Sequence, residues 1–532
     1  MLGLIGIVLS LVLLIVLAYR GINVLVLAPL MALLATVFAG GTPLLATYTQ
    51  VFMTALGEYA ITYFPLFLLG AIFGKLMDDS GGAAAIARFI VKRLGERQAI
   101  LAIVLSCGIL TYGGVSLFVV AFAVFPIAAA LFRAAGVPKR LIPATIGLGS
   151  FTFTMTALPG TPAIQNAIPA PFFGTNAFAA PGLGIIAGLI MFGGGTAWLS
   201  YRSKRARAAG EGYLDEPSEQ APASGTGTSG AGGGAGGTGR PAAPATGGTA
   251  PGPTAYASTG TTAVDEPAGT VATEQRADVD ARDAAQDDPD GPGAAQPGAQ
   301  PPVLLALLPI VVVVALNYVL VTWVFPSMDT SYLAEDAYGA TDIDTVGGIW
   351  AIIVALVAAC VLILALNWRR FSDVKGSVNA GTMGSLLPVF NTSSEVGYGA
   401  VIASLPAFRL VRDAVLGVSD NPVISLAVSV NVLAGITGSA SGGMSIALQT
   451  LGETFRDLAG EQGISLELMH RVTAIASGGF DALPHNGAVI TLLAICGLTH
   501  RQSYKDIAVV AVLIPVVALV VVIALGTLIG GF

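Results

Sequence analysis

Two ionisable side chains stand out because they lie four residues apart in an apolar part of the chain. Asp481 and His485 belong to the segment GGFDALPHNG, residues 478–487. Residues four apart share one face of a helix. A histidine has an ordinary pKa of about 6.5 and can carry a proton near neutral pH, and desolvation raises the pKa of an aspartic acid toward that range. We predict that at least one of the two carries a coupling proton. The alternatives are that Asp481 caps a helix or that the pair lies near the surface.

Four short segments rich in glycine, proline and hydroxyl side chains could bind a small polar ligand. They are TYGGVS (111–116), TALPGTPAIQN (156–166), TGSASGGMS (437–445) and DALPHNG (481–487). Glycine permits close backbone approach and proline removes an intrahelical hydrogen bond, so such segments offer free backbone groups to a carboxylate or a polyol. The predicted substrate-binding residues are Gly113, Gly114, Ser116, Thr156, Gly160, Thr161, Asn166, Ser441, Gly442, Gly443, Ser445 and Asn486. The alternative is that these small residues only let helices pack closely.

The remaining reactive side chains give weaker indications. Glu395, in NTSSEVGYG, is expected to cap a helix or to serve a structural role. Cys107, Cys360 and Cys496 are far apart in apolar surroundings, which argues against a disulfide framework and a metal knuckle. The three histidines form no H-E-x-x-H pattern. We therefore expect no metal site, no catalytic residue and no cofactor, with H⁺ as the coupling ion.

These segments must be positioned by helices that lie in a membrane. Of the 532 residues, 54% are hydrophobic and 11% are charged, whereas a soluble protein carries about 25% charged residues. The mean hydropathy is +0.78. Apolar runs such as LGLIGIVLSLVLLIVLAY from Leu2 have the length needed to cross a bilayer core of about 30 Å, and they lack the alternation of a barrel. The fold class predicted is an all-α polytopic membrane protein.

One internal segment has a different composition from the rest. Residues 203–302 contain runs such as GTGTSGAGGGAGGTG and DDPDGPGAAQPGAQPP, which cannot bury enough apolar surface to fold. We predict a disordered linker between two membrane repeats, residues 1–202 and 303–532.

The two predicted repeats share motifs in the same order. GGVSLFV from Gly113 matches GGMSIAL from Gly442, and ALPGTPAI from Ala157 matches ALPHNGAVI from Ala482. Each half is expected to hold three spanning helices, a surface helix, a helical hairpin, an interrupted helix and a final helix. The hairpins are predicted at about 99–133 and 422–458, and the interrupted helices at about 141–166 and 470–492. The pattern does not distinguish hairpins that dip into the membrane from hairpins that cross it.

The charge distribution predicts that the second repeat is inverted relative to the first. With an odd number of crossings in each half, most Lys and Arg residues outside the linker fall on one side, and only Arg409, Arg412, Arg456 and Arg471 fall on the other. The basic side is the cytoplasmic side. This orientation predicts a cytoplasmic linker and two extracytoplasmic termini.

Inverted repeats with interrupted helices are typical of secondary transporters, in which a central site opens to each side in turn. A channel is one alternative, but it would need a continuous pore lined by polar rings. A membrane-embedded enzyme is another, but it would need a nucleophile with a base, or metal ligands. The polar groups here gather at helix interruptions instead, which favours a transporter.

Several long strings resemble the GntP family of gluconate:proton symporters, within the ion transporter superfamily. They are YFPLFLLGAIFGKLMDDSG from Tyr63, YGGVSLFVVAFAVFPIA from Tyr112, PATIGLGSFTFTMTALPGTPAIQN from Pro143 and ASGGFDALPHNGAVITLL from Ala476. The resemblance covers nearly all of the chain except the linker, which is longer than the family leads one to expect.

The resemblance implies a multi-pass permease of the bacterial inner membrane that takes up a small carboxylate such as gluconate or a related hydroxy acid with protons. A branch of similar permeases takes 3-hydroxybutyrate, so this substrate, another short monocarboxylate and sodium coupling remain alternatives. The expected partners are the substrate and the lipid bilayer, with no nucleic acid. Nothing in the sequence demands an oligomer, although a homodimer is compatible with it.

Overall fold

The computed structural model describes residues 2–19, 22–213, 301–484 and 486–531. In these ranges the chain is all helical and contains no strand, which confirms the predicted fold class. The described parts on both sides of the predicted linker belong to one compact unit. In the first part α11 continues to Ala208, beyond the predicted boundary at residue 202. Residues 214–300 of the predicted linker lie outside the described residues.

The first half begins with three apolar helices. The elements are α1 (Leu2–Tyr19), α2 (Val24–Ala39), a continuous span made of α3 (Leu44–Ala46), the π-helical η1 (Thr47–Phe52) and α4 (Met53–Asp79), then α5 (Gly82–Leu94), α6 (Ala99–Tyr112), α7 (Leu117–Ala134), η3 (Lys139–Leu141), α8 (Ile142–Phe151), η4 (Phe153–Ala157), α9 (Ile164–Ala167), α10 (Pro169–Phe173) and α11 (Pro181–Ala208). The α6–α7 pair lies at the predicted first hairpin, and the helix that begins with α8 loses its regular geometry after Phe151.

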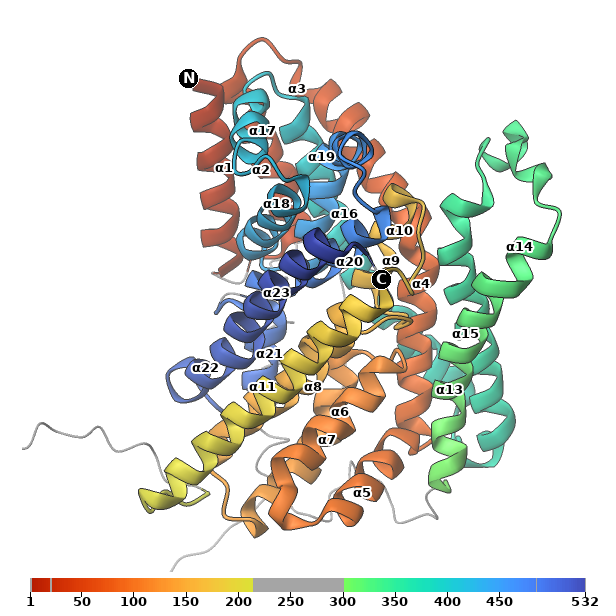
Figure 1. The fold of residues 1–532 in the computed structure, drawn as a ribbon, viewed down its shortest axis with the longest axis vertical. Coiled ribbons are helices and arrows are strands. Elements are labelled where there is room, and N and C mark those ends of the chain that lie inside the picture. The colour runs from red at the N-terminus through yellow and green to blue at the C-terminus, as the bar shows by residue number, and fades with distance from the viewer. Residues whose placement is uncertain (1, 20–21, 214–300, 485, 532) are drawn as a thin grey trace, which may run out of the picture. The chain divides into compact units, whose positions relative to one another are not determined.

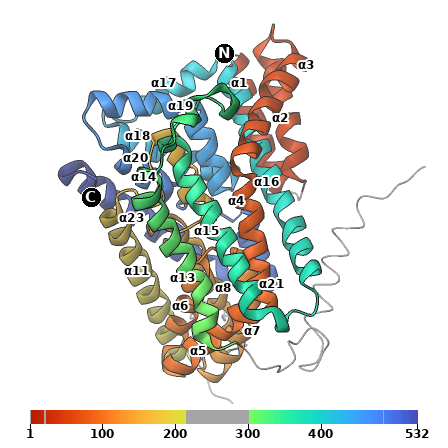
Figure 2. The ribbon, with the colours of Figure 1, turned by 90° about the vertical axis from the view of Figure 1, so that its right-hand side faces the viewer.

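The second half also begins with long apolar helices and continues with a helical hairpin and a broken helix. Its elements are α13 (Val303–Val319) with η5 (Leu320–Val324) and α14 (Phe325–Ser327), a loop with η6 (Ser331–Ala334) and η7 (Asp336–Tyr338), α15 (Ile343–Asn367), α16 (Val374–Ser404), α17 (Phe408–Leu416), α18 (Pro422–Thr437), α19 (Ala440–Glu461), α20 (Leu466–Ser477), η9 (Phe480–Ala482), α21 (Gly487–Ile495), α22 (His500–Ala508), η10 (Val509–Leu513) and α23 (Ile514–Ile529). In Figures 1 and 2 the α6–α7 hairpin and the α18–α19 hairpin lie at opposite ends of the compact unit.

Several helices are long and apolar enough to cross a membrane. Among the described residues five satisfy this test, or six if the bent α5–α6 pair counts as one span. The bend between α5 and α6 is 107°, so the chain changes direction where the surface helix was predicted to end. Trp323 and Trp368 are exposed near opposite ends of the α13–α15 pair, as tryptophans at the two membrane interfaces are.

Glycines bring helices of the two halves into close contact. α4 packs along α16, and a Cβ added at Gly381 would lie 2.8 Å from the Ile72 Cα atom. At Gly397 it would lie 2.8 Å from the Phe52 carbonyl oxygen. Close helix contact through small residues is a main source of packing energy in membranes. The α4–α16 contact therefore holds the halves together and fixes the direction in which α16 presents its polar residues.

Candidate functional site

The first helix interruption is stabilised by an arginine from the other half of the chain. After α8 the backbone passes through η4 and continues as a non-helical segment from Leu158 to Ala163, where its carbonyl groups lack helical partners. Arg471, on α20, is completely buried. Its guanidinium donates to the carbonyl oxygens of Ala157 (3.2 Å), Ala177 (3.2 Å) and Ala179 (2.9 and 2.7 Å).

Asn166 completes this cluster. Its Oδ1 atom accepts a hydrogen bond from Arg471 at 3.0 Å, and its Nδ2 group donates to the carbonyls of Thr161 (3.1 Å) and Ala177 (2.8 Å). The Nε2 atom of His470 lies 3.4 Å from Asn166 Oδ1. The bonds to Arg471 occupy all five guanidinium N–H groups. Arg471 forms no ion pair among the described residues, so a buried positive charge remains beside the interruption.

The second interruption follows α20 and is held by side chains from neighbouring helices. The Phe480 N–H donates to Asn431 Oδ1 at 3.2 Å, and the Tyr504 hydroxyl donates to the Ala482 carbonyl at 3.1 Å. Asn486 caps α21 by accepting from the N–H groups of Ala488 (2.7 Å) and Val489 (3.0 Å). The predicted break is therefore a real gap in helical hydrogen bonding whose ends are satisfied by the protein.

Each hairpin tip is bonded to the interruption of its own half. In the first half the Tyr112 hydroxyl donates to the Pro159 carbonyl at 2.8 Å. In the second half Asn486 Nδ2 donates to the Gly438 carbonyl at 2.7 Å. The two halves thus repeat the same connection between a tip and a broken helix.

The two interruptions also meet each other. A Cβ added at Gly478, directly after α20, would lie 2.7 Å from the Thr156 Cγ2 atom, so the two breaks touch across the halves. α9 of the first half packs on α19 of the second. The four predicted segments are therefore joined by direct contacts in the interior of the protein.

The structure places the other predicted site residues as follows. Gly113 faces Ile310, and Gly114 (φ 95°) faces Pro162 and Leu356. Gly443 packs against the backbone of Ala434 in its own hairpin. These contacts also fit the packing alternative, and the role of the glycines in binding remains a prediction. The remaining members are mostly buried: Thr156, Gly160, Thr161, Ser441, Gly442, Ser445 and Asn486 are buried, and Ser116 is half-buried at the start of α7.

The predicted proton pair is described only in part. Asp481 lies on η9 within the second interruption, and 8% of its surface is exposed. His485 lies outside the described residues. Their coupling role remains a prediction, although the position of Asp481 inside the break is the one expected.

Two buried charged residues were missed by sequence reasoning. Arg471 was counted among the charges on the outer side, but the structure buries it. Glu395 was expected to cap a helix or to serve a structural role; it lies nine residues before the end of α16, with its carboxyl group against Gly442 in the first turn of α19. The sequence pattern that could have indicated burial is the same for both residues. Each is a charged residue followed by a run of small or apolar residues. The partners of Arg471 come from the other half of the chain, which no local pattern identifies.

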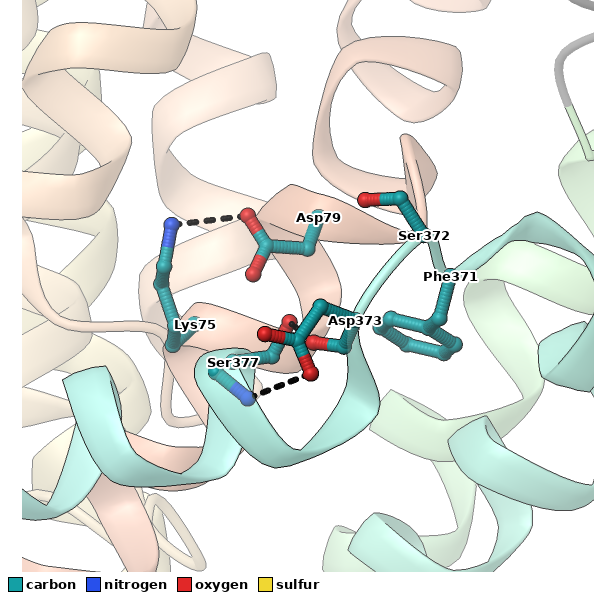
Figure 3. Close-up of a pocket in the computed structure, with 7 residues that line it drawn as sticks. Lys75, Asp79, Phe371, Ser372, Asp373 and Ser377 are labelled. Atoms are coloured by element: carbon teal, nitrogen blue, oxygen red, sulfur yellow. Dashed lines mark hydrogen bonds and ion pairs between the residues drawn. The ribbon is translucent and has the colours of Figure 1, made fainter.

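A separate pocket lies at the end of α4 and the start of α16 (Figure 3). Its charged groups are already engaged, since Lys75 Nζ lies 2.7 Å from Asp79 Oδ1 and Asp373 accepts from the Gly376 N–H at 2.9 Å. The second contact caps the N-terminus of α16. None of the interruption residues lines this pocket, so it is not the predicted site.

Comparisons with known proteins agree with this architecture. Residues 2–200 match the family model described as GntP family permease. The chain is 40% identical over 533 residues to the uncharacterized transporter YxjC of Bacillus subtilis (strain 168), and the match covers 99% of each protein. The chain is a multi-pass membrane protein with several helices that can cross a membrane. It belongs to the GntP family of permeases.

Proposed function

We propose that this permease is a secondary active transporter that moves a small organic anion together with protons by alternating access. The observation that carries the proposal is the contact between the two interrupted helices at Thr156 and Gly478, each broken helix being bonded to the hairpin tip of its own half. Interrupted helices from two repeats that meet inside the membrane form the substrate site of many transporters. The hairpins at opposite ends of the unit (Figures 1 and 2) support inverted repeats.

The charge at the first interruption favours an anionic substrate. Arg471 is fully buried, and its guanidinium is solvated by carbonyl oxygens rather than by a carboxylate. Carbonyl groups satisfy the N–H donors of Arg471 but do not cancel its positive charge. The electrostatic field of this charge is strong where water is excluded. Gluconate-like sugar acids and hydroxy acids fit an anion-selective site that also offers hydroxyl and amide groups. The alternative substrate is 3-hydroxybutyrate or another short monocarboxylate.

Proton coupling requires a group that binds and releases a proton within the transport cycle, and Asp481 and His485 are the residues proposed from the sequence. Sodium is the alternative coupling ion. By the charge distribution we also propose that the protein lies in the bacterial inner membrane with the linker in the cytoplasm and both termini outside.

Counterflow in proteoliposomes tests the transport proposal. Vesicles loaded with unlabelled gluconate or 3-hydroxybutyrate should transiently accumulate the same labelled compound from outside, because a carrier exchanges one molecule for another. A channel would only equilibrate the label. Absence of counterflow with every member of a panel of sugar acids, hydroxy acids and short monocarboxylates would contradict the proposed substrate class.

A further inference from the structure

Glu395 is a carboxyl group inside the protein that the sequence did not assign to transport. It lies on α16, and 5% of its surface is exposed. Its Oε2 atom is buried and has no hydrogen-bond partner among the described residues. The side chain points at the tip of the α18–α19 hairpin, because a Cβ added at Gly442 would collide with Oε2. A side chain at this position would displace the carboxyl group.

Hydroxyl groups surround this carboxyl group. The Ser439 hydroxyl, at the tip of the hairpin, interacts with it. Tyr59 on α4 and Ser445 on α19 face each other, and neither hydroxyl has a hydrogen-bond partner of good geometry in the described chain. The hydroxyl groups of Tyr59 and Ser445, on the side of α16 that carries the carboxyl group, are thus left without a partner among the described residues.

The titratable groups that face Glu395 are tyrosines. Tyr59 and Tyr63 on α4 stack with ring centroids 4.6 Å apart, and the Tyr63 hydroxyl donates to the Ile168 carbonyl at 3.3 Å. The hairpin tip contributes Ser439, Gly442 and Ser445 to this region. Glu395 forms no ion pair with any described Lys, Arg or His. No described Lys, Arg or His therefore neutralises a negative charge on the carboxylate, and what faces it is the partial positive charge at the N-terminus of α19 and the Ser439 hydroxyl.

A buried carboxylate without a partner is costly, and the cost disappears when the group takes up a proton. The protonated form has an O–H donor, and the neighbouring hydroxyls can accept its hydrogen bond. The arrangement described here fits the neutral acid. Movement of the hairpin tip away from α16 would admit water and favour release of the proton.

We propose that Glu395 binds a transported proton and that the α18–α19 tip controls its access to water. This inference rests on the proposed proton-coupled function and adds a carrier to the one predicted at Asp481. The carboxylate takes one proton from the outer solution and becomes a neutral acid. It returns to the carboxylate when it gives that proton to the cytoplasm, and no electrons are transferred.

Glu395→Gln tests the proposal because glutamine imitates the protonated acid but cannot release a proton. In proteoliposomes the variant should lose accumulation of labelled gluconate or 3-hydroxybutyrate driven by an inward proton gradient, while counterflow of the same compound persists. Glu395→Asp should restore gradient-driven uptake with a shifted pH profile. Glu58→Gln is the matched control, since Glu58 is an exposed carboxylate on α4 next to Tyr59, and it should behave as wild type.

An infrared difference spectrum between acid and alkaline pH gives a readout that needs no substrate. The wild type and Glu58→Gln should show the band of a titrating carboxylic acid that Glu395→Gln lacks. Another outcome is that Glu395→Gln lacks the band while uptake by the wild type does not respond to a proton gradient. In that case the proposed coupling fails, although Glu395 is still a group that binds a proton. If Glu395→Gln keeps the band and concentrates substrate like the wild type, the inference is overturned. Uptake by the wild type that follows a sodium gradient and is lost in Glu395→Gln would also overturn it, in favour of a sodium site.

Gly442→Ala tests the control by the hairpin tip. The added methyl group should displace the carboxyl group and shift the pH dependence of uptake. Gly460→Ala, on the same helix with nothing within 4 Å of the added Cβ, should leave it unchanged. Equal pH profiles for both variants and the wild type would show that the tip does not position Glu395.

Discussion

At the scale of single residues, Arg471 shows how a membrane protein can bury a charge without an opposite charge. The guanidinium uses all five N–H groups on three backbone carbonyls and one amide oxygen. Gly184 makes this possible, since a Cβ there would lie 2.5 Å from the Ala157 carbonyl oxygen and 3.2 Å from Arg471 Nε. The arginine thus joins the Ala157 carbonyl at the interruption to the Ala177 and Ala179 carbonyls in the loop before α11.

Arg471→Lys should destabilise the protein strongly, because an ammonium group cannot reproduce the planar set of five donors. Each buried acceptor left unpaired costs about 1–3 kcal/mol, so we expect a loss of about 3 kcal/mol or more. Thermal unfolding of the purified protein in detergent measures it. Arg409→Lys, at an exposed position, is the control and should leave the melting temperature within error. An unchanged melting temperature for Arg471→Lys would contradict the structural role.

Asp481→Asn tests the coupling role predicted from the sequence. Uptake driven by a proton gradient should fall to the level of passive equilibration, whereas counterflow should persist because exchange needs no net proton movement. Both are measured in proteoliposomes, with a protonophore as the control for the gradient. Accumulation by Asp481→Asn that remains sensitive to the protonophore would make this aspartate structural.

At the scale of elements, an ionic cluster at one end of the unit ties helices of the two halves together. Asp506, on α22, is almost fully buried and accepts from Arg140 (3.0 Å), Arg202 (2.7 Å) and the Trp198 indole (3.1 Å). The Glu211 carboxylate binds Arg140 on its other side and raises the pKa of its guanidinium above the usual range. The start of α8, the end of α11 and α22 are thereby fixed to one another.

Asp506→Asn should lower the free energy of unfolding by about 3 kcal/mol or more, because two largely buried guanidinium groups lose a shared carboxylate. The expected result is a lower melting temperature in detergent. Asp457→Asn changes an exposed carboxylate on α19 and should have no effect. If Asp506→Asn and Asp457→Asn have the same melting temperature, the cluster contributes nothing to stability.

The elements themselves were largely predictable from the sequence. Hydropathy predicted the long helices, and Gly and Pro motifs predicted two hairpins and two interruptions at positions where helices α6–α7, α18–α19, α8 and α20 begin or end. The partners of the interruptions were not predictable. Arg471 contacts residues about 300 positions away, and the unpartnered hydroxyls near Glu395, those of Tyr59 and Ser445, come from α4 and α19. Local patterns report helix ends and lengths, but not which distant side chain meets a freed carbonyl.

At the scale of the whole molecule, the described residues that follow α11 are held by contacts with the first half. The Lys139 N–H donates to the Tyr213 carbonyl at 3.0 Å, and the Arg133 guanidinium lies 5.1 Å from the centre of the Tyr213 ring. Glu211 binds Arg140. Residues 203–213 therefore belong with the membrane part, although their composition resembles the start of the linker.

Replacing residues 217–294 with a shorter Gly/Ser linker should leave counterflow near the wild-type rate, since the sequence of this segment cannot build a core. Replacing 210–298 instead removes Glu211 and Tyr213 and should lower the melting temperature. Transport and thermal unfolding of the two variants are compared. A large loss of counterflow in the first variant, with normal expression, would assign a function to the segment.

The bond between Arg471 and the first interruption also bears on how the chain enters the membrane during synthesis. The helix that carries Arg471 leaves the ribosome after its acceptors, Ala157, Ala177 and Ala179, have already been made. A lone arginine at the centre of a helix costs about 2.5 kcal/mol or more on insertion into lipid. Arg471 avoids this cost if its guanidinium binds the carbonyl oxygens of the first half, which are already in the membrane. The first half therefore serves as the template on which α20 is inserted, and α20 should insert poorly when the second half is produced alone.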